Sequence, residues 1–305
     1  MLWTDVAPRD GLQNVKSTIP TEAKIRLVRG LLDAGVPRVE ATAFVSPRWV
    51  PQLADAAAVI DGVRDALTKL RVLIPNARGL ELALEHGVRN VLVTIAATDS
   101  FNRRNVNRSV AESLADLERI VDSARAVRCV VDVALSVSFG CPFEGRVEPD
   151  GVIQLCSELA ARGVDEISLA DTIGVATPAS VKNLVVRSAR VVPLGRLALH
   201  VHDTRGLGVA NVIAAYEAGV RRFDGSVGGV GGCPFAPRST GNVCSEDALQ
   251  ALVALGATTD IDLAHMCRVA EVLAGDLGAD LPGKLYRAGV WDAVPVADTL
   301  EIEAG

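Results

Sequence analysis

The segment Arg196-Leu197-Ala198-Leu199-His200-Val201-His202-Asp203 decides the fold, because it joins a short apolar run to a polar end. The run has the length of a buried strand, and Gly206 follows where the next helix is expected to begin. Side chains two residues apart in a strand point to the same face, so His200 and His202 aim at one place. Two interpretations stay open here: a divalent metal site, or one buried and one exposed histidine.

The same unit of apolar strand and amphipathic helix recurs along the chain, and a glycine often ends the helix, as in Ala34-Gly35-Val36. We expect strands over residues 2–6, 38–41, 71–74, 90–95, 129–137, 166–169, 196–201 and 221–226. Helices are expected near 21–34, 52–67, 78–86, 109–126, 150–162, 178–190, 207–218 and 245–256, with another near 261–275. Eight such repeats predict an α/β fold of the (β/α)8 barrel type with a short C-terminal helical extension. An open doubly wound sheet is the alternative, although no GxGxxG follows the first strand.

Composition bounds the domain organisation and the partners. Residues 1–275 are expected to form one catalytic barrel domain, and residues 276–305 a tail packed on it. The net charge of −6 argues against a nucleic-acid partner. No apolar stretch approaches the roughly 20 residues that span a bilayer, and no basic-then-apolar leader begins the chain. The six cysteines form no CxxC pair, which predicts reduced thiols in a cytoplasmic protein.

Polar residues gather where the predicted strands end, while the strand bodies read as apolar. Arg9-Asp10 follow the first strand, Glu40 ends the second, Asp171-Thr172 end the sixth, and His200 and His202 end the seventh. Catalytic groups of such barrels lie at the carboxyl ends of the strands, so we expect these side chains to share one site.

Asp10, His200 and His202 would give a mixed carboxylate–imidazole metal site with no thiolate in the pattern. That donor set suits Mg²⁺ or Mn²⁺ acting as a Lewis acid better than a closed structural zinc site. Arg9 adjoins it as a permanent cation suited to a developing enolate oxygen, or else serves as a salt-bridge partner.

The glycine-rich stretch 228–232 predicts a mobile or tightly bent loop, because glycine gives up packing for conformational freedom. Cys233 at its far edge is either an acid or base over the barrel mouth or a buried small hydrophobe. Asn242 either offers an amide oxygen to the metal or caps the helix that begins near Ser245.

Six ordered blocks together resemble the 3-hydroxy-3-methylglutaryl-CoA lyase family, within the metal-dependent barrel lyases and synthases that share a pyruvate carboxyltransferase-like domain. The blocks cover residues 6–14, 40–52, 140–145, 171–175, 200–204 and 231–242. The resemblance implies a divalent cation, an acyl-CoA substrate, a homodimer, and a retro-Claisen cleavage that gives acetyl-CoA and a keto acid. Its implied metal ligands are Asp10, His200, His202 and Asn242. It also implies Arg9 as enolate stabiliser, His200 and Cys233 in proton transfer, and Glu40 and Asp171 as supporting polar residues.

The chain departs from the family pattern at three places near the expected site. Arg205 stands where many such lyases carry an aromatic residue, Arg238 where glycine is usual, and Val15 where an acidic residue is usual. These departures bear on the acyl group accepted rather than on the metal. Arg103-Arg104-Asn105 after the fourth strand would either meet CoA phosphates or lie in a solvated loop.

Two other functions fit the same residues. The first is an aldolase or acyl-condensing synthase acting on 2-oxo acids, which the absence of a long C-terminal extension counts against. The second is a barrel that binds acyl-CoA or metal without turnover.

Overall fold

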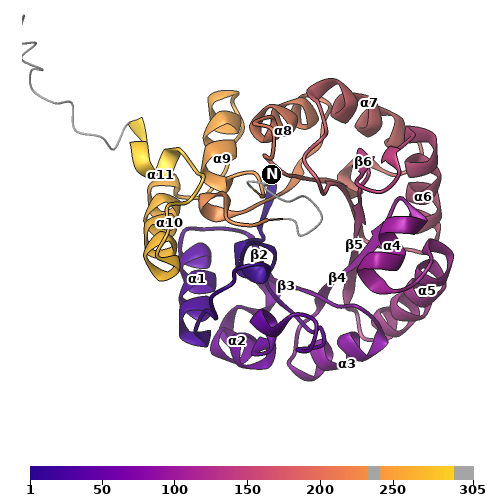
Figure 1. The fold of residues 1–305 in the computed structure, drawn as a ribbon, viewed down its shortest axis with the longest axis horizontal. Coiled ribbons are helices and arrows are strands. Elements are labelled where there is room, and N and C mark those ends of the chain that lie inside the picture. The colour runs from indigo at the N-terminus through magenta and orange to yellow at the C-terminus, as the bar shows by residue number, and fades with distance from the viewer. Residues whose placement is uncertain (233–240, 292–305) are drawn as a thin grey trace, which may run out of the picture.

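The computed structural model describes residues 1–232 and 241–291 of the chain. Eight parallel strands close into a barrel in the order β1-β10-β9-β8-β5-β4-β3-β2, with helices around them (Figure 1). The strands are β1 (Leu2–Asp5), β2 (Arg38–Ala43), β3 (Leu70–Leu73), β4 (Asn90–Ala96), β5 (Val130–Ser136), β8 (Glu166–Asp171), β9 (Leu197–Val201) and β10 (Arg222–Gly225). The predicted (β/α)8 barrel is confirmed, and the open sheet is excluded.

The helices follow the strands and cover the outer face of the barrel (Figure 1). They are α1 (Thr21–Asp33), α2 (Ala56–Gly62), α3 (Ala77–Glu85), α4 (Asp99–Val106), α5 (Val110–Ala126), α6 (Pro149–Ala161), α7 (Pro178–Ser188), α8 (Gly208–Glu217), α9 (Ser245–Ala254), α10 (Leu263–Leu277) and α11 (Leu285–Ala288). The start of α5 shows how local sequence fixes a boundary. Ser109 and Glu112 form a capping box there, each side chain bonding the backbone N–H of the other.

Beyond shifts of one or two residues at the ends of strands and helices, the structure differs from the sequence-based prediction in one helix and in added short elements. The helix expected over 52–67 is interrupted, because Val63 leaves the helical conformation after α2 and a 3₁₀ turn continues from Arg64 to Lys69. The helix α4 and the small hairpin of β6 (Gly140–Cys141) and β7 (Gly145–Arg146) were not predicted. Both are too short to show a clear period in the sequence.

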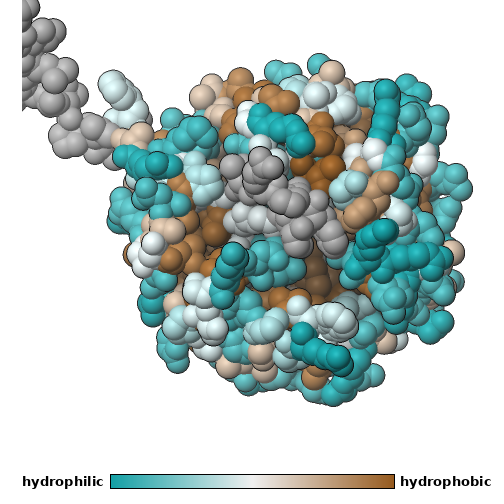
Figure 2. Space-filling model, viewed as in Figure 1, coloured by the Kyte–Doolittle hydropathy of each residue, from teal (hydrophilic) through white to brown (hydrophobic). Residues whose placement is uncertain are grey.

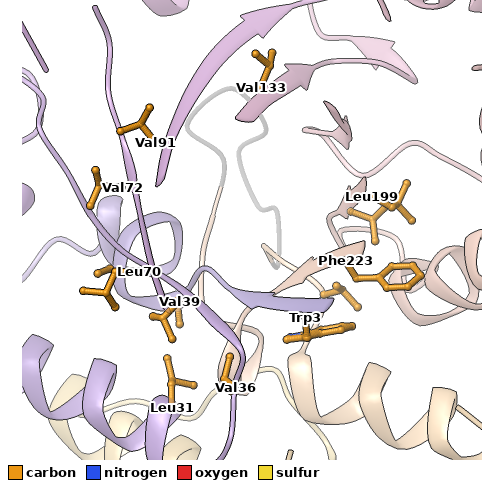
Figure 3. Close-up of a cluster of buried hydrophobic side chains, with 14 of the residues drawn as sticks. Trp3, Leu31, Val36, Val39, Leu70, Val72, Val91, Val133, Leu199 and Phe223 are labelled. Atoms are coloured by element: carbon orange, nitrogen blue, oxygen red, sulfur yellow. The ribbon is translucent and has the colours of Figure 1, made fainter. Parts of the chain in front are cut away.

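The apolar core lies between the outer face of the barrel and the helices. Val39 and Leu70 point from neighbouring strands toward Leu31 of α1, and Trp3 and Phe223 pack together with ring centroids 6.1 Å apart (Figure 3). Full burial of each such Val or Leu side chain stabilises the fold by about 1.5–3 kcal/mol. This layer holds the barrel and leaves its interior face free for other residues.

The interior face of the barrel is charged, which corrects the prediction of apolar strand bodies. Successive side chains of a strand alternate between the two faces, so apolar residues that face the helices alternate with polar residues that face the barrel interior. The buried polar residues of the strands are Thr4, Asp5, Arg38, Glu40, Thr42, Arg71, Asp132, Ser136, Glu166, Ser168, Asp171 and Asp224. Buried charges persist only when they are paired, and the arginines among them lie between the carboxylates.

The described part of the C-terminal segment packs beside the start of the glycine-rich stretch. The backbone N–H of Gly283 donates to the carbonyl of Gly228, and Leu281 fills the space beside the same glycine. Helix α10 runs through to Leu277, so no break falls at residue 275, and the division into domain and tail stays a prediction. Residues 292–305 lie outside the described range. No helix within the described ranges combines the length and apolarity needed to cross a membrane.

Candidate metal centre and active site

Asp10, His200 and His202 converge at the carboxyl ends of the strands. One ligand atom from each of the three lies within 4.8 Å of the ligand atoms of the other two. His200 comes from β9 and His202 directly follows that strand, so the alternation of side chains brings both rings to one side, with centroids 5.3 Å apart. The structure therefore brings together residues separated by about 190 positions in the chain, the juxtaposition that the histidine pair predicts.

A π-helical turn, Ala7–Gly11, presents Arg9 and Asp10 to the site. The carbonyl of Val6 accepts hydrogen bonds from the backbone N–H groups of Arg9, Asp10 and Gly11 and so fixes the turn. Gly11 is needed because a Cβ there would lie 2.7 Å from a side-chain carbon of Val230. Single π turns are frequent at functional sites, since they turn side chains in directions that an α-helix does not allow.

Asn242 joins the cluster by pairing with the end of β9. It forms an antiparallel bridge with His202, and the N–H of Asp203 donates to the carbonyl of Gly241. The amide Nδ2 of Asn242 lies 2.9 Å from Oδ2 of Asp10. Asn242 does not cap the next helix, because the residue at the N-cap of α9 is Cys244.

Gly231 and Gly241 lie against each other beside Asn242. A Cβ on Gly241 would lie 2.0 Å from the carbonyl oxygen of Gly231, and one on Gly231 would lie 2.5 Å from Nδ2 of Asn242. Both glycines have positive φ values, 139° and 91°. Only residues without side chains let the chain pass this closely to the cluster.

Two buried polar atoms test whether a cation fits. Nδ1 of His202 and Oδ1 of Asn242 have no hydrogen-bond partner among the described residues. Buried polar atoms of native proteins are nearly always satisfied, so a missing partner calls for an ion or a water. A divalent cation coordinated by carboxylate, imidazole and amide oxygen would supply it, and the donor set suits an oxygen-preferring ion.

Asp10 and His202 are in the protonation states that bind a metal ion. Burial opposes ionisation of Asp10, but Arg9, His200 and His202 outweigh it and lower its pKa to about 2. Burial and the neighbouring His200 lower the pKa of His202 to about 4, so its ring is neutral at pH 7. An anionic carboxylate and a neutral imidazole are the forms that bind metal.

His200 has a different environment. Its Nδ1 lies 3.5 Å from Oδ2 of Asp224 on the neighbouring strand. Burial lowers the pKa of His200, but the hydrogen bond to Asp224 and the charge of Asp10 outweigh it and raise the pKa above the ordinary value. The contact to Asp224 leaves Nε2 as the ring nitrogen that is free for the cavity.

Arg9 is held between two carboxylates. Its Nε donates to Oε1 of Glu40, and its Nη1 lies 2.5 Å from Oδ1 of Asp10. Glu40 was predicted at the end of the second strand, but β2 continues to Ala43, and Glu40 lies fully buried inside the barrel. The guanidinium is therefore a salt-bridge partner and also lines the cavity.

Asp171 ends β8 as predicted, with its carboxylate turned toward the following backbone. It accepts hydrogen bonds from the N–H groups of Val175 and Ala176, which shapes the loop beside the site. Arg205 donates from Nη1 to the carbonyls of Ile173 and Gly174, so it fastens the same loop from outside. Cys233 and Arg238 lie outside the described residues.

A cavity of about 850 Å³ opens above the cluster and extends toward α4. Asp10, His200 and His202 lie in its wall, and Arg103, Arg104 and other residues of the α4 region form the opposite part. Hydrophilic residues dominate this face, and hydrophobic ones show in the central hollow (Figure 2). The arginine pair was expected to meet CoA phosphates or to lie in a solvated loop; it lies on a helix at the rim.

The five described cysteines are buried and form no disulfide. Asp224 and Arg71 are site residues that the sequence reasoning missed. The available signal was the alternation in their strands: Arg71 stands among apolar residues in β3, and Asp224 lies between Phe223 and Gly225 in β10.

Comparison with known proteins agrees with this geometry. The HMGL-like family model matches residues 1–273. Hydroxymethylglutaryl-CoA lyase of Gallus gallus is 40% identical over 93% of this chain and 96% of its own. (R)-citramalyl-CoA lyase of Chloroflexus aurantiacus is also 40% identical, over 93% of each chain.

A solved structure is similar across nearly the whole chain. An HMG-CoA lyase from Acinetobacter baumannii, in complex with coenzyme A and 3-methylmalate, superposes with a TM-score of 0.91 and 37% identity, covering 96% of each chain. With the family model spanning the barrel and relatives of this identity covering more than nine-tenths of the sequence, the chain belongs to the HMGL-like family.

Proposed function

We propose that this protein is a divalent-metal-dependent carbon–carbon lyase. It would cleave a 3-hydroxy-3-methylglutaryl-CoA-type thioester by a retro-Claisen reaction to acetyl-CoA and a keto acid, acetoacetate for that substrate. The observation that carries the proposal is the convergence of Asp10, His200 and His202 beside Arg9 at the base of a large cavity. The lyase relatives, 40% identical over 93% of the chain, support the same reaction class.

The cleavage requires a cation near the oxygen that gains charge. Asp10, His200, His202 and Asn242 would hold the metal, which when bound supplies Lewis-acid polarisation of substrate oxygens. Arg9 offers a second, permanent positive charge for the thioester enolate oxygen. Glu40 and Asp10 hold that guanidinium before substrate arrives, so little reorganisation is needed during the reaction.

Proton movement is proposed for two residues. His200 has Nδ1 occupied by Asp224, so Nε2 is the atom that would bind the metal or accept the substrate's hydroxyl proton. A His200→Gln variant separates these roles: a ligand role predicts weaker Mn²⁺ binding, and a role in proton transfer alone predicts unchanged binding with low turnover. Cys233 is proposed to protonate the released enolate, for which Cys233→Ser should slow turnover while Mn²⁺ binding remains. Asp171 is proposed to support the site by shaping the loop after β8.

The rim of the cavity suits the phosphates of coenzyme A. Arg103, Arg104 and Arg108 all line it, and guanidinium groups bind phosphate oxygens through paired N–H donors. Trp49, with 79% of its surface exposed, lines the same cavity and offers a ring for stacking. Coenzyme A is the ligand named for the similar A. baumannii structure, which supports an acyl-CoA substrate here.

The acyl group of the substrate is to be decided by assay, because lyases named for hydroxymethylglutaryl-CoA and for (R)-citramalyl-CoA both share 40% sequence identity with this chain. Purified protein loaded with Mg²⁺ or Mn²⁺ should release acetyl-CoA from one of these thioesters in a coupled assay. Asp10→Asn and metal-stripped protein serve as controls. No release from either thioester, or faster condensation of pyruvate with acetyl-CoA, would refute the lyase and favour a synthase.

The remaining assignments extend this proposal. Mg²⁺ or Mn²⁺ is proposed because carboxylate, amide and imidazole donors surround the centre without a thiolate among the described residues. A homodimer and an absence of nucleic-acid and membrane partners are proposed from the resemblance and the net charge of −6. A cytoplasmic location is proposed from the buried, unbridged cysteines. Light scattering tests the homodimer, and cell fractionation tests the cytoplasmic location.

A further inference from the structure

Arg71 is a fully buried arginine at the centre of the barrel, two strands away from the nearest metal-cluster residue in the barrel order. Its side chain has no exposed surface and contacts four carboxylates, those of Glu40, Asp132, Glu166 and Asp224. Burying a guanidinium costs desolvation free energy, so we consider what these contacts of Arg71 do for the site. The carboxylates on two of its sides are the ones that bind Arg9 and His200.

The first branch leads to Arg9. Nε of Arg71 donates to Oε2 of Glu40 at 2.8 Å, and Nη2 lies 2.6 Å from the same oxygen. The other oxygen of Glu40 accepts the hydrogen bond from Nε of Arg9. Glu40 is thus clamped between two guanidinium groups, and Arg71 fixes the orientation in which it receives Arg9.

The second branch leads to His200. Nη2 of Arg71 donates to Oδ1 of Asp224 at 3.1 Å, and Oδ2 of Asp224 faces Nδ1 of His200 at 3.5 Å. Outer partners of a metal-binding histidine orient its ring and select its tautomer. The same nitrogen of Arg71 contacts both Glu40 and Asp224, so the two branches meet at one group.

We propose that Arg71 is a positioning residue that couples the anion-stabilising side of the site, Arg9, to the metal-binding side, His200. The expected effect on turnover rests on the proposed function. The orientation of Arg9 and His200 does not, and it is measured without turnover. A planar, forked guanidinium is needed, because a lysine ammonium does not present the same set of parallel donors to two carboxylates.

The competing explanation is that Arg71 only neutralises buried charge. Arg38 is the matched control, since it is also a buried barrel arginine and pairs with Asp132 and Glu166. Among the described residues, Arg38 forms no hydrogen bond or ion pair with Glu40 or Asp224; its remaining hydrogen bond goes to the hydroxyl of Thr4. Loss of either arginine therefore removes one positive charge from a group of buried carboxylates, but of the two only Arg71 contacts the carboxylates that bind Arg9 and His200.

The test compares Arg71→Met, Arg71→Lys and Arg38→Met with the unaltered protein. Mn²⁺ affinity is measured by electron paramagnetic resonance of free Mn²⁺, and the melting temperature is recorded for each variant. We expect Arg71→Met to weaken Mn²⁺ binding about 10–100-fold, as is typical for outer-shell partners. Arg38→Met should lower the melting temperature comparably and leave the affinity within about threefold, well below that range. Arg71→Lys keeps the positive charge, and its Mn²⁺ affinity should lie between those of Arg71→Met and Arg38→Met. If Arg71→Met does not fold, Arg71→Lys serves as the test variant.

A metal-free readout separates this inference from the proposed function. The chain has only four histidines, so side-chain ¹⁵N spectra resolve the tautomer of His200. The unaltered protein and Arg38→Met should show the proton on Nδ1, toward Asp224, whereas the Arg71 variants should show mixed tautomers. Equal Mn²⁺ affinities and equal spectra for the Arg71 and Arg38 variants would overturn the proposal, whether or not the enzyme cleaves a thioester. If the unaltered protein shows no turnover but the spectra of the Arg71 variants differ from that of Arg38→Met, only the proposed function is refuted.

Discussion

Replacing Glu246 by glutamine should stabilise the protein at alkaline pH. Glu246 is fully buried at the start of α9, and both of its carboxylate oxygens accept from the N–H of Gly228 at 3.0 Å. Burial raises its pKa from 4.5 to about 7, although the bond to Gly228 opposes the shift. The group is therefore more easily protonated in the folded chain than in the unfolded chain.

The sign and size of the effect follow from proton linkage. Between pH 4.5 and about 7 the folded chain keeps a proton that the unfolded chain has lost, so the free energy of unfolding falls as pH rises. Each pH unit in that window is worth about 1.4 kcal/mol, which makes the full loss about 3 kcal/mol above pH 7. Glutamine resembles the protonated acid in shape and carries no charge, so it avoids this loss while its carbonyl oxygen still accepts from Gly228.

The assay is urea unfolding of wild type and Glu246→Gln at pH 5 and pH 8. We expect nearly equal stabilities at pH 5 and an advantage for the variant of up to about 3 kcal/mol at pH 8. Other buried acids with raised pKa values, such as Asp5, contribute equally to both proteins and cancel in the difference. A variant that is less stable than wild type by the same amount at both pH values would refute the reasoning.

Three further predictions concern the site. Asp10→Asn should lower Mn²⁺ affinity and thioester cleavage by more than the roughly 10–100-fold typical of outer-shell changes, measured by titration and by acetyl-CoA release. Gly241→Ala places a Cβ 2.0 Å from a backbone carbonyl at a φ of 91°, so Mn²⁺ affinity should fall; Gly195→Ala, with nothing within 4 Å, should leave it unchanged. Arg103→Ala combined with Arg104→Ala should raise KM for the CoA thioester several-fold with kcat nearly constant, and high salt should shrink the difference from wild type. A kcat loss without a KM change would contradict a role in phosphate binding.

The parts of the site that follow a strand were predictable from the sequence. His200 and His202 share a face by the alternation of a strand, and Asp10 follows the first strand, so a barrel brings them to the same end. Repeated strand and helix patterns were enough to predict that barrel.

The contacts inside the barrel were not predictable in the same way. Glu40 was expected at the end of the second strand, but β2 continues to Ala43, and the inward side chain of Glu40 binds Arg9 and Arg71. Which inward residues meet depends on the stagger between strands, and the sequence of one strand carries no record of it. Asn242 reached Asp10 only through its pairing with His202.

The pairing of β1 with β10 closes the barrel, and β9 lies beside β10. Asp10 follows β1 and His200 belongs to β9, so an ion shared by them would link the two neighbours of the last strand, β10, across the closure of the barrel. A nascent chain could not complete the centre until translation had passed Asn242, late in synthesis. Metal occupancy would thus report ring closure, and stripping the ion should hasten unfolding from this closure outward.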